Sequence, residues 1–248
     1  MTTLLENKEQ ISLITQDNVQ ICANYYNNAS DEVVIIAPGW CMTKDSKAFS
    51  KISEMFAQKY DVLCFDFRGH GKSSGAFTFT AKELRDIDAV IKFAKSKNYK
   101  KIHLAGFSLG GSIVLLCAAE NKDVSSVIAV SPPSDFSKIE NRMWKKAAWY
   151  ETLKKFELDR FLSLRFYLLP LKKKKPIDFV DKITVPTLFI AGENDPTVYP
   201  WHTKKLYDNA VCKKDFKLYK NGFHAEDLFL YYKKTFSEDC LCWLDKVC

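Results

Sequence analysis

The sequence predicts an α/β protein in which helices cover both faces of a mostly parallel β-sheet, giving three layers. Short apolar runs alternate along the chain with segments whose apolar residues recur at helical spacing. A hairpin pattern precedes this alternation, and the chain has no internal repeat or low-complexity linker. Because strands separated by helices need crossover connections, most of the strands are expected to be parallel.

The first predicted element is an antiparallel hairpin. Two segments place apolar residues at every second position, as a strand with one buried face does. Their aligned positions are Ile11, Leu13, Thr15, Val19, Ile21 and Ala23. The polar residues at 16–18 between them have the chemistry of a turn.

The hairpin is followed by the alternating elements. The unbroken apolar run at 33–37 suits a strand that is covered on both faces, and 62–65 is a second buried strand. Further strands are expected at 102–105, 127–130, 187–191 and 216–219. Helical spacing of apolar residues occupies 49–56, 84–94, 113–119, 201–207 and 228–243.

The alternation is interrupted between residues 134 and 181, where no run suits a strand. The segment is too long and too apolar for a bare loop, so we expect two or three helices that form a cap. The predicted organisation is a core of residues 1–133 and 182–248 with a cap of residues 134–181. Three aromatic cap residues are candidates for substrate contacts, with packing of the cap as the alternative: Trp144, Trp149 and Phe161.

Composition narrows the class of protein. A chain of 248 residues with 47% apolar residues can bury one large core without disulfides or metals. The net charge of +7 lies partly in Lys172 to Lys175, but no nucleic-acid motif accompanies it, so a solvated lysine-rich surface is expected. The N-terminus lacks a signal-peptide pattern and no apolar stretch reaches membrane-spanning length, so we expect a cytoplasmic protein without an integral membrane segment.

The eight cysteines do not form a metal-binding or disulfide pattern. None of them has paired CxxC spacing, and no Cys/His cluster suits zinc. Cys64 and Cys117 lie inside apolar segments. We therefore expect buried free thiols and no metal.

Residues Gly106 to Gly111, GFSLGG, match the G-x-S-x-G nucleophile elbow between a buried strand and a helix. A strand that turns directly into a helix forces the corner residue, Ser108, into strained dihedrals that expose its hydroxyl. Neighbouring glycines allow the strand and helix to approach closely. Ser108 is therefore the candidate nucleophile, with a plain glycine-rich turn as the alternative.

A serine hydroxyl needs a base to accept its proton, and the chain has four histidines. His224 directly follows the last strand, at the carboxyl edge where Ser108 also lies, so it is the candidate base. We expect His103 in the core, His202 on the surface, and His70 in a structural role, with an approach to a ligand as its alternative.

The base needs a carboxylate that fixes its tautomer and stabilises the imidazolium. Asp195 follows the strand at 187–191, and Glu193 in the same loop is its close competitor. Asp181 lies before that strand, and Asp227 follows the histidine instead of preceding it. Asp195 is therefore the preferred acid.

Backbone amides must stabilise the negative charge that develops on the substrate oxygen. The residue after the serine, Leu109, should supply one amide. Trp40, in the loop after the strand at 33–37, is the candidate for the second, with Cys41 as the alternative. Pro38 has no N–H to donate, and an ordinary tight turn is the alternative function of this loop.

These segments resemble the serine hydrolase branch of the α/β-hydrolase superfamily over nearly the whole chain. Five match in order: the Pro38 loop, the loop from Asp66 to Ser73, the Ser108 turn, the Asp195 loop and the His224 loop. The resemblance implies an eight-stranded, mostly parallel sheet with the cap after the sixth strand. Many members have His-Gly where this chain has Pro38-Gly39. Within the superfamily, the chain is similar to small esterases of the monoacylglycerol-lipase or cinnamoyl-esterase kind.

The predicted function is hydrolysis of a small carboxylic ester through an acyl-enzyme, without a metal or organic cofactor. Ser108 would attack, His224 would move the proton, Asp195 would orient His224, and the Trp40 and Leu109 amides would hold the oxyanion. The aromatic cap favours medium-chain or aromatic esters. A peptidase or thioesterase with the same residues, or a binding protein with an idle site, are the alternatives, and the oligomeric state is not predicted.

Overall fold

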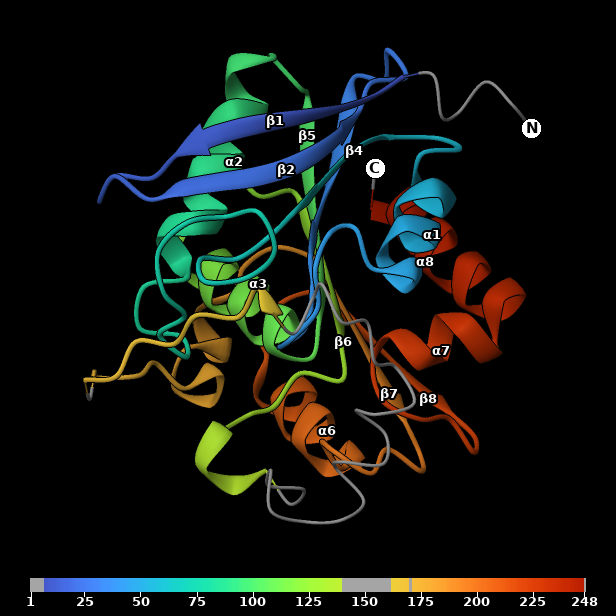
Figure 1. The fold of residues 1–248 in the computed structure, drawn as a ribbon. Helices are drawn as coiled ribbons and strands as arrows, with labels where there is room; N and C mark the ends of the chain where they lie inside the picture. Colours follow the sequence, from blue (N-terminus) through green and yellow to red (C-terminus); the bar gives the residue numbers. More distant parts are fainter. Residues whose placement is uncertain (1–6, 140–161, 170, 248) are drawn as a thin grey trace.

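Figure 1 shows the computed structural model, which describes residues 7–139, 162–169 and 171–247. Eight strands form one sheet with the order β1-β2-β4-β3-β5-β6-β7-β8. The pairs β1·β2 and β2·β4 are antiparallel and the other pairs are parallel, which confirms the predicted sheet. The strands are β1 (Lys8–Ile14), β2 (Gln20–Tyr26), β3 (Glu32–Ala37), β4 (Asp61–Phe65), β5 (Lys101–Phe107), β6 (Ser126–Val130), β7 (Thr187–Gly192) and β8 (Lys214–Tyr219).

Helices cover both faces of this sheet, as predicted. They are α1 (Lys47–Phe56), α2 (Leu84–Ser96), α3 (Leu109–Glu120), α6 (Pro200–Asn209), α7 (Glu226–Tyr231) and α8 (Lys233–Val247). Helices α2, α3 and α6 pack on one face, and α1, α7 and α8 pack on the other (Figure 1). Along β3, Val33 and Ile35 face the first layer while Val34 and Ile36 face the second. This alternation explains why the strand sequence is apolar without interruption.

The N-terminal antiparallel hairpin is confirmed, and the structure gives its register. Ile11 pairs with Ala23 and Leu13 pairs with Ile21. In the turn, Asn18 has φ 59°, a left-handed conformation that asparagine tolerates better than most residues. The Thr15 hydroxyl accepts from the Val19 N–H at 2.9 Å and closes the turn.

The single helix predicted over 228–243 is wrong, because the structure divides this segment into α7 and α8. Tyr232 lies between them with φ −122° and ψ 37°. Its hydroxyl donates to the Lys220 carbonyl at 3.0 Å and its ring packs against Tyr219. Since Leu228 of α7 and Phe236 of α8 enter the same core cluster, the apolar pattern continues across the break and hides it.

Part of the predicted cap can be described. Residues 140–161 lie outside the described residues, so the cap helices and the domain boundaries remain predictions. The described residues 162–169 lie along the loop that follows β4, where Phe166 forms an isolated parallel bridge with Phe77. The Arg165 N–H donates to the Gly69 carbonyl at 2.9 Å, and its carbonyl accepts from Phe77 at 2.8 Å. The short 3₁₀ helices η1 (Phe136–Lys138), η2 (Pro176–Asp178) and η3 (Val180–Lys182) flank the same region.

Candidate active site

Ser108 occupies the sharp corner between β5 and α3. Its φ of 53° and ψ of −114° are strained for a residue with a side chain. The Ser108 N–H donates to the Val130 carbonyl at 2.8 Å, which anchors the corner to β6. A Cβ on Gly110 would lie 2.0 Å from the Ala37 carbonyl oxygen, so a larger residue at 110 would clash with the backbone after β3. The GFSLGG sequence thus forms the predicted elbow.

A hydrogen-bonded chain joins the serine, the histidine and the aspartate. The Ser108 Oγ lies 2.8 Å from His224 Nε2, and His224 Nδ1 lies 2.7 Å from Asp195 Oδ2. Because a carboxylate can only accept, Nδ1 carries the imidazole proton and Nε2 is left to accept from the serine hydroxyl. The arrangement is the one that proton transfer from a serine to a histidine requires.

The Asp195 carboxylate is buried but fully engaged. Its side chain is 1% exposed, and Oδ1 accepts from the N–H groups of Thr197 and Val198, each at 2.9 Å. These backbone donors offset the loss of water around a buried charge. They also hold the carboxylate at a fixed position for His224.

The loops that carry Asp195 and His224 are joined because β7 and β8 are neighbouring parallel strands. The Asn194 N–H donates to the Gly222 carbonyl at 2.9 Å. A Cβ on Gly192 would lie 2.2 Å from the Phe223 carbonyl oxygen, so only glycine allows this approach. Glu193, the competing acid, is exposed and accepts instead from the Asn221 N–H at 2.9 Å. The structure therefore brings Asp195, and not Glu193, to the histidine.

The loop after β3 lies against the elbow. A Cβ on Gly39 would lie 3.4 Å from the Ser108 Cβ. The Cys41 N–H donates to His70 Nε2 at 3.3 Å, so this amide is already used within the protein. The Trp40 N–H donates to no acceptor among residues 7–139, 162–169 and 171–247. The first amides of a helix have no acceptor within it, and Leu109 is the first residue of α3. Of the two candidates in the loop, Trp40 is the one with an available donor.

His70 is buried, and its environment keeps it neutral. Burial lowers its pKa to about 4, although a bond with the Arg68 carbonyl, 3.2 Å from Nδ1, acts in the opposite direction. Arg68 is buried too and pairs with Asp86 at 2.7 Å and with Asp17 at 2.9 Å. A structural role was expected for His70, but its hydrogen bond with the Cys41 N–H was not predicted. The position of His70 after β4, at the same sheet edge as Ser108, was the signal for it.

The other two histidines lie away from this chain of hydrogen bonds. His103 is 1% exposed and contacts Ser126 Oγ at 2.8 Å, which confirms its core position. The surface position expected for His202 is wrong, because the residue is fully buried and its Nδ1 lies 2.8 Å from Ser134 Oγ. Leu206, one helical turn later, is buried on the same face of α6. That spacing was the available signal.

The predicted substrate contacts Trp144, Trp149 and Phe161 lie outside the described residues. An aromatic group that sequence reasoning did not assign lies beside the loop after β3 instead. The Trp40 and Phe79 rings are 6.3 Å apart, and Phe79 stacks on Phe166 at 6.3 Å with an interplanar angle of 17°. Phe77 lies 4.4 Å from Phe79. These rings form a continuous apolar contact from Trp40 to the described part of the predicted cap.

The cysteines agree only in part with the expectation of buried thiols. Cys22, Cys64, Cys117 and Cys240 are buried, whereas Cys41 and Cys212 are partly exposed and Cys242 is exposed. Burial raises the pKa of the Cys64 and Cys240 thiols, so they stay protonated. In the described part of the chain we find no cluster of metal-ligating residues and no helix that is long and apolar enough to cross a bilayer.

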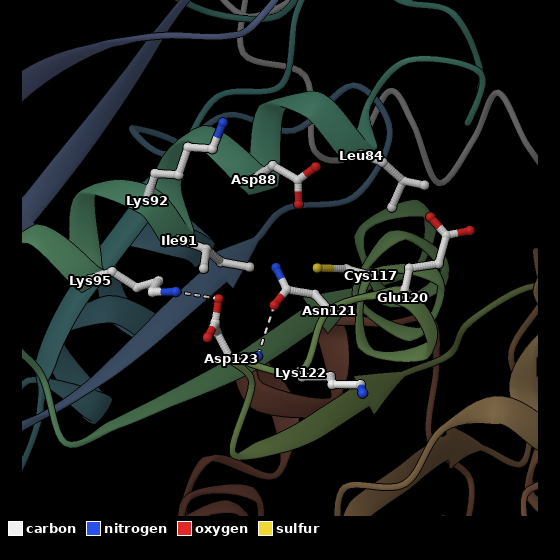
Figure 2. A pocket seen from close by; sticks show the side chains of 10 residues that line it. All are labelled: Leu84, Asp88, Ile91, Lys92, Lys95, Cys117, Glu120, Asn121, Lys122 and Asp123. Atoms are coloured by element: carbon white, nitrogen blue, oxygen red, sulfur yellow. Dashed lines mark hydrogen bonds and ion pairs between the residues drawn. The ribbon is translucent and has the colours of Figure 1, made fainter.

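A separate pocket of about 540 Å³ lies near the other end of α3 (Figure 2). Its lining includes Cys117 and Asn121 from the end of α3 and Lys95 and Asp123, which form an ion pair at 2.6 Å. Ser108 precedes the first residue of α3, so the helix separates the pocket from the serine by roughly 15 Å, at 1.5 Å per residue. None of the three hydrogen-bonded residues lines this pocket.

Comparison with known proteins agrees with the fold. The uncharacterized protein YqkD of Bacillus subtilis is 30% identical over 175 residues, which cover 67% of this chain and 56% of that protein. The chain spans between 48% and 67% of the length of three curated relatives that it matches. The esterase Pf2001 of Pyrococcus furiosus has a similar structure, with a TM-score of 0.78, 22% identity, and coverage of 96% of this chain and 92% of that one.

A further similar structure is that of Est1E from Butyrivibrio proteoclasticus with bound ferulic acid. Its TM-score is 0.67 at 24% identity, covering 94% of this chain and 99% of that one. The family model described as the alpha/beta hydrolase fold matches residues 32–154, a range that contains both the loop after β3 and the Ser108 elbow. Together with the eight-stranded sheet, these matches show that the chain belongs to the α/β-hydrolase superfamily.

Proposed function

We propose that this protein is a serine hydrolase that cleaves a carboxylic ester through an acyl-enzyme intermediate. The observation that carries the proposal is the hydrogen-bonded chain from Ser108 Oγ through His224 to Asp195, with distances of 2.8 and 2.7 Å. The three residues come from separate loops at the carboxyl edge of one sheet, which is where open α/β sheets build their sites.

In the first half of the reaction, Ser108 Oγ attacks the ester carbonyl while His224 Nε2 takes its proton. Asp195 stabilises the imidazolium that forms. The Trp40 and Leu109 amides donate to the oxyanion of the tetrahedral intermediate. The intermediate collapses when His224 returns the proton to the leaving alcohol, and the acyl group stays on Ser108. In the second half, His224 deprotonates a water that attacks the acyl-enzyme and releases the acid.

We propose a small ester with an apolar acyl or aryl group as the substrate. The aromatic contact from Trp40 through Phe79 to Phe166 supports an apolar partner beside the oxyanion amides. The similarity to Est1E, which was solved with ferulic acid, adds support for an aryl group. Matched ester, thioester and aminoacyl amide substrates would separate an esterase from a thioesterase or a peptidase with the same residues.

The direct test is the Ser108→Ala variant with a p-nitrophenyl butyrate assay and a fluorophosphonate probe. We expect kcat to fall by at least about 10⁴-fold and labelling to disappear, because Ser108 Oγ is the atom that forms the acyl bond in the proposed reaction. Ser237→Ala, on the exposed face of α8, is the control and should behave as the wild type. Ester hydrolysis that persists unchanged in Ser108→Ala would reject the proposal. A folded wild-type protein that the probe does not label would favour a binding protein.

A further inference from the structure

We infer that His70 is a positioning residue that sets the conformation of residues 38–46, here called the oxyanion loop. It does so by accepting a hydrogen bond from the Cys41 N–H. The inference deepens the proposed function and rests on it, because it concerns the loop that would present the Trp40 amide. In this role His70 acts through its hydrogen bond to the loop, whereas a histidine that only packs in the core would contribute no such bond.

The oxyanion loop contains a tight turn. The Met42 N–H donates to the Gly39 carbonyl at 3.1 Å, which closes a four-residue turn with Trp40 and Cys41 at its centre. Cys41 has φ 59°, as the third residue of a type II turn requires. That position favours glycine or asparagine, so a cysteine there needs support from its surroundings.

His70 supports this turn. Turns of type I and type II differ in the orientation of the central peptide, here the one between Trp40 and Cys41. The N–H of this peptide donates to His70 Nε2 at 3.3 Å, so the acceptor favours the observed orientation. The turn runs beside Ser108, because a Cβ added to Gly39 would lie 3.4 Å from the Ser108 Cβ. A changed orientation of the central peptide would therefore move the backbone of Trp40 relative to Ser108.

His70 can only accept at Nε2. Its Nδ1 lies 3.2 Å from the Arg68 carbonyl, which requires the proton on Nδ1 and leaves a lone pair on Nε2. The ring is 1% exposed and packs edge-on against Phe77 at 4.9 Å, so it cannot rotate into solvent. Arg68 is itself held by Asp86 and Asp17. His70 Nε2, the acceptor, is therefore held in a fixed position.

A second contact joins the same two loops. The buried Asp66 carboxylate accepts from the Lys44 N–H at 2.7 Å and from the Lys72 N–H at 2.9 Å. These two bonds hold the oxyanion loop at Lys44 against the loop that carries His70. The Asp66 contact lies beyond the turn, at Lys44, whereas His70 contacts the Trp40–Cys41 peptide itself.

The experiment compares two substitutions in the full-length protein. His70→Phe keeps a flat ring beside Phe77 but removes the acceptor, whereas the Gln side chain of His70→Gln can place an oxygen where Nε2 lies. We expect kcat of His70→Phe to fall by about 10- to 100-fold with KM within about twofold, because an oxyanion donor acts on the transition state. His70→Gln should recover kcat to within about threefold of the wild type. His103→Phe, at an equally buried histidine, is the control and should lower the unfolding midpoint without lowering kcat per labelled Ser108.

Hydrogen exchange supplies a readout that does not depend on activity. The peptide that contains Cys41 should lose protection in His70→Phe and keep it in His70→Gln. Equal kcat in wild type and His70→Phe, or a folded His70→Gln that recovers neither kcat nor protection, would overturn the inference. If the wild type shows no Ser108-dependent hydrolysis, the proposed function fails, and the exchange result alone decides whether His70 holds the loop.

Discussion

A cluster of loops lies at the start of α3 and a pocket lies near its end, and the two regions differ in the chemistry of their side chains. At its start, the carboxyl edge of the sheet brings together Ser108, His224 and Asp195. Asp195 is buried, and hydrogen bonds join the three side chains. Toward its end, a pocket of about 540 Å³ is lined by lysines and carboxylates such as Lys95 and Asp123, which are about half exposed. The pocket offers exposed charged side chains, whereas the sheet edge offers a hydroxyl, an imidazole and a carboxylate within hydrogen-bond distance of one another.

Backbone strain separates the two regions in the same way. Five non-glycine residues with positive φ follow strands or flank the histidine at the carboxyl edge: Cys41, Ser108, Ser131, Asn221 and Ala225. None of the residues that line the pocket has a positive φ. Strained dihedrals persist only where the surrounding structure holds them, and they cluster at functional sites. The comparison teaches that converging chemistry and backbone strain distinguish the sheet edge from a pocket whose lining residues have neither.

The largest effect that would test this contrast is expected from Asp195→Asn. The Asn oxygen would take the place of Oδ1, which accepts from the Thr197 and Val198 N–H groups, so the NH2 group would face His224 Nδ1 and donate to it. The imidazole would then adopt the wrong tautomer, and kcat should fall by about 10⁴-fold. Steady-state kinetics on a p-nitrophenyl ester measure the change. Glu193→Gln, in the same loop, is the matched control and should stay within about twofold. A larger loss in Glu193→Gln than in Asp195→Asn would reverse the assignment of the acid.

The next effect concerns the close contact that joins the acid and histidine loops. In Gly192→Ala, the new Cβ would lie 2.2 Å from the Phe223 carbonyl oxygen and must push the loops apart. We expect the free energy of unfolding to fall by about 2–4 kcal/mol, together with a loss of activity. Gly39→Ala is the control, because its Cβ meets no atom closer than 3.4 Å. Urea unfolding curves measure both variants, and equal stabilities would show that the contact is not needed.

Acid should destabilise the protein through burial of His70 at the carboxyl edge. Burial lowers its folded-state pKa to about 4, whereas an unfolded histidine has a pKa near 6.5. Below pH 6.5 the unfolded chain therefore binds the proton first, so stability falls as the pH drops toward 4. The expected contribution is about 2–3 kcal/mol between pH 7.5 and 4.5. His70→Phe lacks this group and should show a shallower decline in urea unfolding, and an unchanged slope would contradict the prediction.

The smallest effect is expected in the pocket. Lys95 and Asp123 form an exposed ion pair, and such pairs contribute about 0–1 kcal/mol. We expect Lys95→Ala to change the free energy of unfolding by less than about 0.5 kcal/mol and kcat by less than about twofold. A loss of activity comparable with that of Asp195→Asn would place the function in the pocket and break the comparison.

Much of the fold was predictable because its signals are local. The unbroken apolar run at Val33–Ile36 marks a strand that is covered on both faces, and the structure places its alternate residues in two core clusters. The break at Tyr232 was not predictable in this way. It depends on a hydroxyl contact with Lys220 and a ring contact with Tyr219, and neither interrupts the apolar period of the segment.

The site divides along the same line. The order of Ser108, Asp195 and His224 after their strands placed all three at one sheet edge, because parallel strands end together. The sequence favoured Asp195 but left Glu193 as a close competitor, since both follow β7 and only the fold shows which carboxylate faces His224. It also left Trp40 and Cys41 as alternatives for one amide.

The amino-acid sequence by itself determined the layers of the fold and which loops meet above the sheet, because apolar periodicity and strand order are properties of short segments. Only the tertiary structure decided which carboxylate faces His224, which amide of the β3 loop stays available, and that His202 is buried. Those outcomes depend on contacts between residues far apart in the chain, such as Cys41 with His70 and Ser134 with His202. The direction of a side chain or a peptide is set by its neighbours in space, and these become known only when the chain has folded.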